Sequence, residues 1–331
     1  MIITRTPYRI SFFGGGTDYP GWFNKHNGAV LSTSINKYCF ISCRRLPQFF
    51  EHKFRIVYSK IESVSNINEI LHPSVRETLL FNKVKDGLEI HHDGDLPARS
   101  GLGSSSSFTV GLLNALEAQQ GKLISKNELA KKAIHIEQNL IRENVGSQDQ
   151  IATAYGGFNK ISFFNNGEFF VQPIITSNER IQELNNNLML FFTHTTRIAS
   201  EIAAHHISNI NKKNKELKLM FEMVNEAISL IQDQNEPIEK FGNLINETWK
   251  LKKSVSNKVS NEFIDNIYDQ ALKGGALGGK LLGAGGGGFI LFFVPPKKQK
   301  KVIEKLKNLV HVPFKFENQG SSVVLFEPNG L

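Results

Sequence analysis

The sequence predicts an α+β protein with two domains, and three observations support this fold class. The first 60 residues alternate apolar and polar side chains in short runs, which is typical of β-strands. From Ile198 to about Ala271 the apolar residues recur at helical spacing instead, with interruptions near Pro237 and Ser256. Strands and helices do not alternate as regular βαβ units, which argues against a doubly wound sheet. Because the composition changes near residue 180, we expect domains over residues 1–180 and 181–331.

The first domain should consist mainly of strands, with two helices in its second half. A glycine- and serine-rich loop opens the first helix, whose apolar positions run from Val110 to Leu116. Ser125 is expected to cap the second helix, because Glu128 follows it by three residues in a capping-box arrangement. The expected strands lie at the N-terminus and at Ala29–Cys43, Phe54–Tyr58, Leu88–His92, Gly157–Phe163 and Phe169–Gln172.

The second domain should open with a strand at Leu188–Thr193 and continue with the helical segments. A glycine-rich stretch from Gly274 to Gly288 then leads into an apolar strand at Phe289–Val294. The chain is expected to close with a helix at Lys297–Leu309 and strands at His311–Phe316 and Ser322–Phe326.

Composition excludes several classes of protein. Hydrophobic residues make up 40% of the 331 residues, which is enough for a core and argues against a disordered chain. The longest uninterrupted apolar run is Phe289–Val294, six residues, whereas a membrane-spanning helix needs about 20. The N-terminus has no apolar signal segment. We therefore expect a soluble, cytoplasmic protein without a membrane partner, in which Cys39 and Cys43 are buried thiols.

The chain is basic, with 39 Lys and Arg against 31 Asp and Glu, a net charge of +8. This charge suggests an anionic partner without identifying it. Much of the excess is lysine within Lys212–Lys258 and Lys297–Lys307, which we interpret as solvent-exposed helix faces. No basic patch interleaved with aromatic residues is present, so we expect no nucleic-acid partner, with a non-catalytic nucleic-acid-binding module kept as an alternative.

Fourteen of the 27 glycines fall in three short stretches, and the middle stretch is the best candidate for a phosphate site. It leads directly into a helix, whose first N–H groups lack internal partners and point outward at the positive end of the helix dipole. Glycines allow a phosphate to approach the backbone, and serine hydroxyls can bind phosphate or Mg2+. The candidate residues are Gly101, Leu102, Gly103, Ser104, Ser105, Ser106 and Ser107.

The third glycine stretch contains two better-known phosphate motifs, and both fail on context. Gly274 to Lys280 matches the start of a P-loop, but Leu281 replaces the Ser or Thr that would hold Mg2+. Gly283–Gly288 matches GxGxxG, but a strand follows where the dinucleotide motif requires a helix. We expect a tight loop in which the backbone approaches a ligand or another backbone segment.

The acidic candidates are not decisive when each is taken alone. Asp149 lies in a short polar segment, and Glu137 lies twelve residues earlier, beside the apolar stripe of its helix. A loop carboxylate and a helix-surface glutamate are the simplest readings, and Arg9 and Asp18 are equally open. The residues alone indicate a phosphate-binding enzyme without specifying its reaction.

Three segments, in order, resemble the motifs of the GHMP small-molecule kinases: Pro7–Asp18, Leu96–Ser106 and Lys280–Gly288. The resemblance covers essentially the whole chain. It implies a ribosomal-S5-like α/β N-terminal domain and a ferredoxin-like α+β C-terminal domain, with ATP and Mg2+ as cofactors. It also implies a phosphotransferase that acts on an alcohol group, with a small molecule and ATP as its partners.

The first motif also bears on the substrate. The form from Arg9 to Pro20 is similar to that of the heptose and fucose kinases of the family, and Gly15 and Gly16 replace a Glu-His pair of galactokinases. This implies phosphorylation of the anomeric C1 hydroxyl of D-glycero-D-manno-heptose 7-phosphate, on the route to a GDP-activated heptose for surface polysaccharide. Another sugar kinase, fucokinase- or galactokinase-like, is the alternative.

The resemblance implies a role for each motif residue. Gly101–Ser107 would hold the ATP phosphates, with Ser105 and Glu137 as Mg2+ ligands. Asp149 would accept the proton of the sugar hydroxyl, and Arg9 would pair with this carboxylate and stabilise the transferring phosphoryl group. The residues expected to face the substrate are Gly15, Gly16, Thr17 and Asp18, with Gly286 and Gly287 closing the site from the second domain.

A sugar phosphate also needs a cationic pocket. Arg197, Lys25 and His26 are the candidates, and no motif selects among them. The sequence does not give the oligomeric state.

Overall fold

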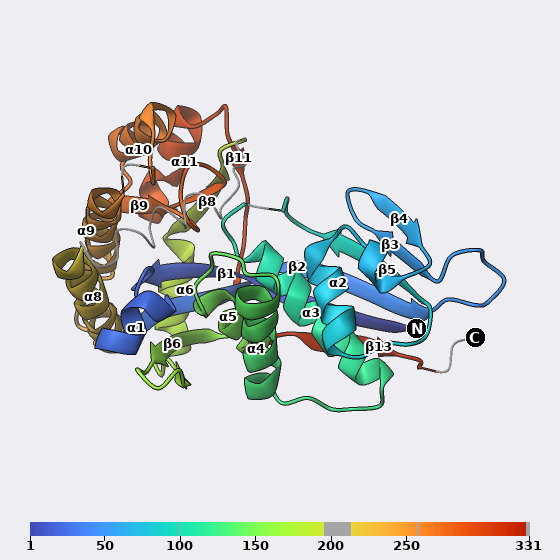
Figure 1. Cartoon of the computed structure of the whole chain (residues 1–331). Coiled ribbons are helices and arrows are strands. Elements are labelled where there is room, and N and C mark those ends of the chain that lie inside the picture. The colour runs from blue at the N-terminus through green and yellow to red at the C-terminus, as the bar shows by residue number, and fades with distance from the viewer. Residues whose placement is uncertain (99, 195–212, 257, 329–331) are drawn as a thin grey trace.

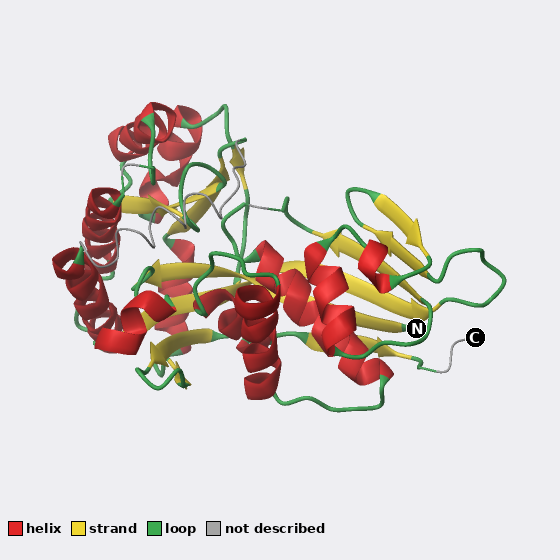
Figure 2. Ribbon diagram, in the orientation of Figure 1, coloured by secondary structure: helices red, strands yellow, loops and turns green. Residues whose placement is uncertain are grey.

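The computed structural model describes residues 1–98, 100–194, 213–256 and 258–328. Its strands form a large sheet of nine strands and a smaller sheet of four (Figures 1 and 2). Helices cover both sheets, so the predicted α+β class is confirmed. The strands of the large sheet are β1 (Ile2–Phe13), β2 (Gly28–Arg45), β3 (Phe54–Val57), β4 (Ile61–Val64), β5 (Leu88–Gly94), β6 (Phe158–Phe163), β7 (Phe169–Pro173), β12 (Phe316–Glu317) and β13 (Ser322–Phe326).

Strands β1 and β2 form the centre of the large sheet. They pair antiparallel along most of their length, and β2 also pairs with β5, β6 and β12 at different points. The second half of β1, residues 6–13, is buried throughout, although it includes Tyr8 and Arg9 among its apolar and small residues. Burial on both faces explains this pattern, because helices pack on each side of the strand.

Helix α3 (Ser104–Gln119) packs directly on β1 and β2. Helices α4 (Lys126–His135) and α5 (Gln148–Tyr155) pack against α3 and against each other. The Ser125 hydroxyl accepts the backbone N–H of Glu128, which confirms the predicted cap of α4. Four shorter helices were not predicted: α1 (Pro20–His26), α2 (Pro73–Phe81), α5 and α6 (Asn178–Asn186).

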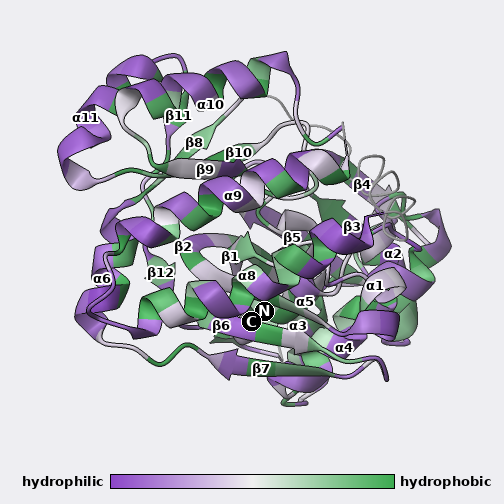
Figure 3. Ribbon diagram, turned by 90° about the vertical axis from the view of Figure 1, so that its left-hand side faces the viewer, coloured by the Kyte–Doolittle hydropathy of each residue, from purple (hydrophilic) through white to green (hydrophobic). Residues whose placement is uncertain are grey.

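The smaller sheet has the order β11-β8-β10-β9. Its helices enclose a core that includes Phe191, Trp249 and Phe292, and the outer surfaces of α10 and α11 are mostly hydrophilic (Figure 3). The elements are β8 (Leu188–Phe192), α8 (Asn214–Gln232), α9 (Glu239–Val255), α10 (Glu262–Gly274), β9 (Gly278–Leu281), β10 (Phe289–Phe293), α11 (Pro296–Lys305) and β11 (Val310–His311).

The C-terminal strands do not stay with the smaller sheet. β13 pairs antiparallel with the free edge of β1, where Ile2 faces Phe326, and β12 pairs with β2. The last two strands of the chain therefore belong to the large sheet, because the open edge of β1 supplies unpaired backbone groups that the returning chain satisfies. The division near residue 180 stays a prediction.

Two glycine clusters that are distant in sequence lie against each other. Gly101 precedes α3, and Gly283 lies in the loop between β9 and β10, both with left-handed backbone at φ +85° and +70°. A Cβ atom at Gly283 would lie 2.5 Å from the Cα of Gly101. Glycine at these positions therefore allows the loop between β9 and β10 to touch the segment that leads into α3.

Replacing Gly283 with alanine should destabilise the protein more than left-handed strain alone explains. Gly167 offers a matched control, because its φ of +82° is similar but nothing lies within 4 Å of an added Cβ. We expect Gly167→Ala to cost about 1–2 kcal/mol of unfolding free energy, and Gly283→Ala to cost about 1–3 kcal/mol more because of the backbone clash. Urea denaturation measures both, and equal losses would contradict the contact.

Candidate active site

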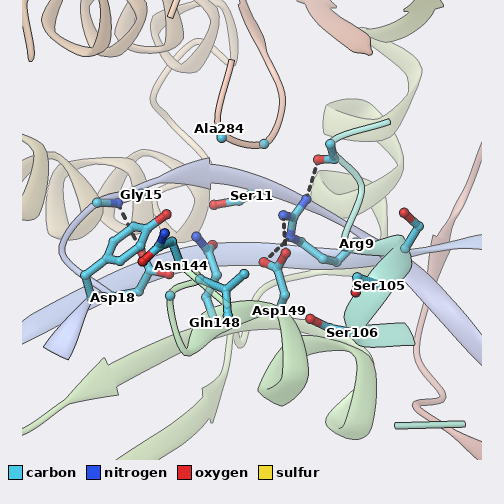
Figure 4. Close-up of a pocket in the computed structure, with 18 of the residues that line it drawn as sticks. Arg9, Ser11, Gly15, Asp18, Ser105, Ser106, Asn144, Gln148, Asp149 and Ala284 are labelled. Carbon is cyan, nitrogen blue, oxygen red and sulfur yellow. Dashed lines mark hydrogen bonds and ion pairs between the residues drawn. The ribbon is translucent and has the colours of Figure 1, made fainter. Parts of the chain in front are cut away.

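A cavity of about 270 Å3 lies where β1, the start of α3 and the loop between β9 and β10 meet. In Figure 4, Arg9 and Asp149 face each other at its centre, with Ser105 and Ser106 to one side and Gly15 and Asp18 to the other. The lining residues are Arg9, Ser11, Gly15, Gly16, Asp18, Tyr19, Gly101, Gly103, Ser104, Ser105, Ser106, Glu143, Asn144, Val145, Gly146, Gln148, Asp149, Met220, Lys252, Lys280, Gly283 and Ala284.

Arg9 and Asp149 form a bidentate ion pair. The guanidinium donates from Nε and Nη2 to the two carboxylate oxygens, both at 2.7 Å, and from Nη1 to the Gly101 carbonyl at 2.7 Å. Arg9 is 4% exposed and Asp149 25% exposed at the side chain, so the carboxylate is the accessible partner. Asp149 lies in the first turn of α5 rather than in the expected polar loop, and the positive end of that helix favours its charge.

The predicted phosphate loop is divided between the pocket and the core. Ser104, Ser105 and Ser106 form the first turn of α3 and line the pocket together with Gly101 and Gly103. Helix α3 begins directly after Gly103, whose left-handed backbone turns the chain into the helix. The pocket therefore meets the N-terminus of a 16-residue helix, the arrangement that binds anions.

Two residues of the predicted loop point elsewhere. The side chain of Leu102 is fully buried in the core, and the Ser107 hydroxyl lies 3.1 Å from the carbonyl oxygen of Pro7. Neither residue lines the cavity, because the helical turn that presents Ser104 to Ser106 directs the next side chain onto β1. Their positions indicate structural roles.

Glu137 is fully buried, which corrects the reading of a helix-surface glutamate. It lies in a π-helical segment (Ile136–Leu140) that continues α4, and its Oε2 accepts hydrogen bonds from Ser106 and Gln150. Burial, together with the nearby Glu143 carboxylate, raises its pKa to about 7. Among the described residues its Oε1 has no hydrogen-bond partner, and a cation would satisfy this atom.

The hydroxyl that contacts Glu137 belongs to Ser106, one residue after the expected ligand. Ser105 is exposed and lines the same pocket. Because both hydroxyls belong to the first turn of α3, a magnesium ion near Glu137 fits the side chains that are present.

Asp18 lies at the other end of the pocket and is almost fully buried. The Gly16 N–H donates to its Oδ1 at 2.9 Å, and burial raises the pKa of the carboxyl to about 6. A Cβ atom at Gly146 would lie 1.9 Å from Oδ2, so the glycine leaves room for this carboxylate. Gly15 also lines the pocket, as expected for residues that face the substrate.

Other predicted substrate residues do not lie at the cavity. Thr17 is fully buried, and its hydroxyl lies within hydrogen-bond distance of the Gly14 and Ala29 carbonyls, so it closes a turn. In the glycine loop, Gly283 and Ala284 line the cavity in place of Gly286 and Gly287, because the Gly286 N–H bonds to the Val259 carbonyl.

The residues that the sequence suggested for binding the sugar phosphate do not lie at the cavity where the structure describes them. Lys25 and His26 lie in the exposed last turn of α1 and do not line the cavity. Arg197 lies outside the described residues.

Two lysines line the cavity that the sequence did not single out. Lys252, in α9, donates to the carbonyls of Leu281 and Gly283, and Lys280, in β9, donates to the Phe12 carbonyl. Lys252 was included in the solvent-exposed helix faces, and that interpretation is wrong for this residue. Lys280 is the first residue of the third motif, and this position could have identified it as a pocket residue. Lys252 lies among other lysines in the sequence, and no motif distinguishes it from them.

Comparison with known proteins gives matches over both halves of the chain. The model of the GHMP kinases N terminal domain matches residues 70–157, and that of the GHMP kinases C terminal matches residues 214–311. A D-glycero-alpha-D-manno-heptose 7-phosphate kinase of Campylobacter jejuni is 31% identical over 296 residues, 86% of each chain. An L-fucokinase/L-fucose-1-P guanylyltransferase of Bacteroides fragilis is 31% identical over 86% of this chain, which spans 34% of that longer protein.

Solved structures agree with these matches. A putative sugar kinase from Campylobacter jejuni superposes with a TM-score of 0.70 at 27% identity, over 97% of both chains. A D-glycero-D-manno-heptose 1-phosphate kinase from Bacteroides thetaiotaomicron shares the fold, with a TM-score of 0.75 at 23% identity, over 99% of this chain and 100% of that one. Within the described ranges, no helix has the length and apolar character needed to cross a membrane. The protein belongs to the GHMP kinase family.

Proposed function

We propose that the protein transfers the γ-phosphoryl group of ATP to the anomeric C1 hydroxyl of D-glycero-D-manno-heptose 7-phosphate, giving the 1,7-bisphosphate. The observation that carries the reaction is the Arg9–Asp149 pair beside the N-terminus of α3. The similarity to the Campylobacter jejuni enzyme supports the sugar. The product would supply a GDP-activated heptose for surface polysaccharide, and we place the enzyme in the cytoplasm, where ATP is available.

The pocket has one end for each substrate. The first turn of α3 would receive the ATP phosphates, since helix N–H groups and serine hydroxyls donate to phosphate oxygens. The Asp18 end would receive the sugar hydroxyls, for which its buried carboxyl group is an acceptor. Asp149 lies between these ends, so it would orient the C1 hydroxyl and accept its proton. Phosphoryl transfer depends mainly on such positioning and on charge neutralisation.

Magnesium would be held by Glu137 together with the hydroxyls of Ser105 and Ser106. The unpartnered Oε1 of Glu137 supports this assignment, because a fully buried carboxylate oxygen needs a compensating partner. The ion would neutralise charge on the ATP phosphates. Arg9 would pair with Asp149 and, through its two remaining N–H donors, stabilise the phosphoryl group in transfer.

The substrate is tested by measuring ADP release with a panel of sugars. We expect turnover of D-glycero-D-manno-heptose 7-phosphate in the presence of Mg-ATP, with far lower kcat/KM for free fucose and galactose, because both lack a phosphate. Efficient phosphorylation of free fucose or galactose, without turnover of the heptose phosphate, would replace the proposed substrate and leave the kinase reaction intact.

Asp149→Asn tests the proposed proton acceptor. The amide keeps the shape of the side chain but cannot accept the proton, so we expect kcat to fall about 100- to 10,000-fold. The affinity for Mg-ATP should fall far less than kcat, because the first turn of α3 and the Arg9 hydrogen bond to the Gly101 carbonyl do not involve the replaced carboxylate. Rapid-quench kinetics and nucleotide titration measure the two quantities, after thermal melting has shown that the variant is folded. A kcat near wild type would remove Asp149 from the mechanism.

Asp18→Asn should stabilise the protein and weaken sugar binding. Burial raises the Asp18 pKa from 3.8 to about 6 in the folded state, so the folded protein holds a proton that the unfolded chain has released between these values. Wild-type stability therefore falls as pH rises from about 4 to 6. At pH 8 we expect the variant to gain about 1–3 kcal/mol in unfolding free energy, because it avoids ionising the buried group.

The gain should shrink toward pH 4, which urea denaturation at several pH values measures. The exposed Asp269→Asn is the control and should change stability little at any pH. The sugar KM of Asp18→Asn should rise while the ATP KM is unchanged. A loss of stability at pH 8, or an unaltered sugar KM, would contradict the assigned position of Asp18.

A further inference from the structure

The proposed substrate carries a phosphate of its own, and the pocket must bind it at a place other than the ATP end. Arg9, Lys252 and Lys280 are the cationic residues that line the cavity in the described part of the chain. The charge of Arg9 is already compensated by its bidentate ion pair with Asp149. The two lysines are therefore the cations available to a second anion.

Lys280 is a buried cation with little compensation. Its side chain is 3% exposed, and its ammonium group donates to the Phe12 carbonyl at 2.7 Å. An ammonium group has three N–H donors, and the described residues provide this one acceptor for them. A buried charge without a paired carboxylate is costly, so an anionic ligand at this point would compensate it.

Lys252 adds a second positive charge from another element. Its ammonium group donates to the carbonyls of Leu281 at 2.9 Å and Gly283 at 2.6 Å, which leaves a third N–H. Neither lysine forms an ion pair with a described carboxylate within 4.0 Å. Burial and the neighbouring cations lower the pKa of both, which an anion bound between them would reverse.

The position of the lysines favours the sugar end of the pocket. The Phe12 carbonyl that accepts from Lys280 lies near the end of β1, where the chain turns toward Asp18, and Lys252 is a close neighbour of Lys280. The first turn of α3 lies on the opposite side of Arg9 from Asp18 (Figure 4). The phosphoryl group in transfer must lie between α3 and Asp149. An anion at the lysines is therefore a different group from the one being transferred.

We propose that Lys252 and Lys280 form the subsite that binds the phosphate already present on the sugar substrate. The identity of the sugar rests on the proposed function. The preference for a phosphate monoester rests on the two lysine ammonium groups. It takes the place of Lys25 and His26, which lie outside the cavity. The two lysines belong to α9 and β9, so the smaller sheet and its helices would bind the phosphate of the sugar.

The test compares Lys252→Met and Lys280→Met with wild type, using D-glycero-D-manno-heptose 7-phosphate and the same heptose without its phosphate. Each variant should raise the KM for the phosphorylated sugar about 10- to 100-fold, as expected for a lost charge-assisted hydrogen bond. The KM values for ATP and for the unphosphorylated heptose should not change. Lys250→Met is the matched control, since Lys250 is exposed on the same helix and pairs with Glu247.

Two results would overturn the subsite. An unchanged KM for the phosphorylated sugar in both variants shows that the phosphate binds elsewhere. An equal fall in kcat with both sugars, at unchanged KM, assigns the lysines to the phosphoryl group in transfer. Thermal melting identifies a variant that does not fold, and Lys252→Met then carries the comparison, because its side chain is less buried than that of Lys280.

Calorimetry separates failure of the subsite from failure of the proposed function. Heptose 7-phosphate is titrated into each protein without ATP, so that no turnover is needed. Binding to wild type that weakens in the two variants supports the subsite even if the kinase assay selects another sugar. Absence of binding to wild type overturns the subsite, and the kinase assay then decides the function independently.

Discussion

The ion pair between Arg9 and Asp149 fixes the geometry on which the rest of the site depends. Arg9 belongs to the central strand β1, Asp149 to the first turn of α5, and the same guanidinium binds the Gly101 carbonyl ahead of α3. One side chain thus joins the sheet to both helices that form the reacting centre. Since Arg9 is 4% exposed, loss of either partner would leave an uncompensated charge in the interior. The contact therefore stabilises the fold and holds the acceptor carboxylate beside the phosphate loop.

Close backbone contacts built from glycine support this pair. The loop that contains Gly283 reaches Gly101 because neither residue has a Cβ atom, and Gly146 leaves the space that the Asp18 carboxylate occupies. These glycines are required for close packing, whether or not they contact a phosphate. This explains why the third stretch contains nucleotide-binding strings out of context: its glycines allow β9 and β10 to close on the N-terminal half of the chain.

Sequence patterns predicted local structure well where neighbouring residues decide it. The Ser125 cap, the helix that starts at Ser104 and the strand at Phe289 all follow from short-range signals. The site was reached through family resemblance, and its remaining errors concern which way a side chain faces. Thr17 is turned into the fold and Lys252 into the cavity, because elements far away in the sequence cover one face and leave the other open. A single sequence does not encode that choice locally.

The charges in the pocket suggest how it discriminates among sugars. Burial holds Asp18 with a raised pKa at one end and Lys252 and Lys280 with lowered pKa values near it, so both signs of charge are poorly solvated before a ligand binds. A sugar hydroxyl can donate to Asp18, and a phosphate can accept from the lysines. A sugar without a phosphate would offer the ammonium groups no acceptor, so it would lack the attraction that the phosphorylated sugar gains. Burial of the lysine ammonium groups lowers the stability of the fold, and the same burial favours a sugar whose phosphate compensates their charge.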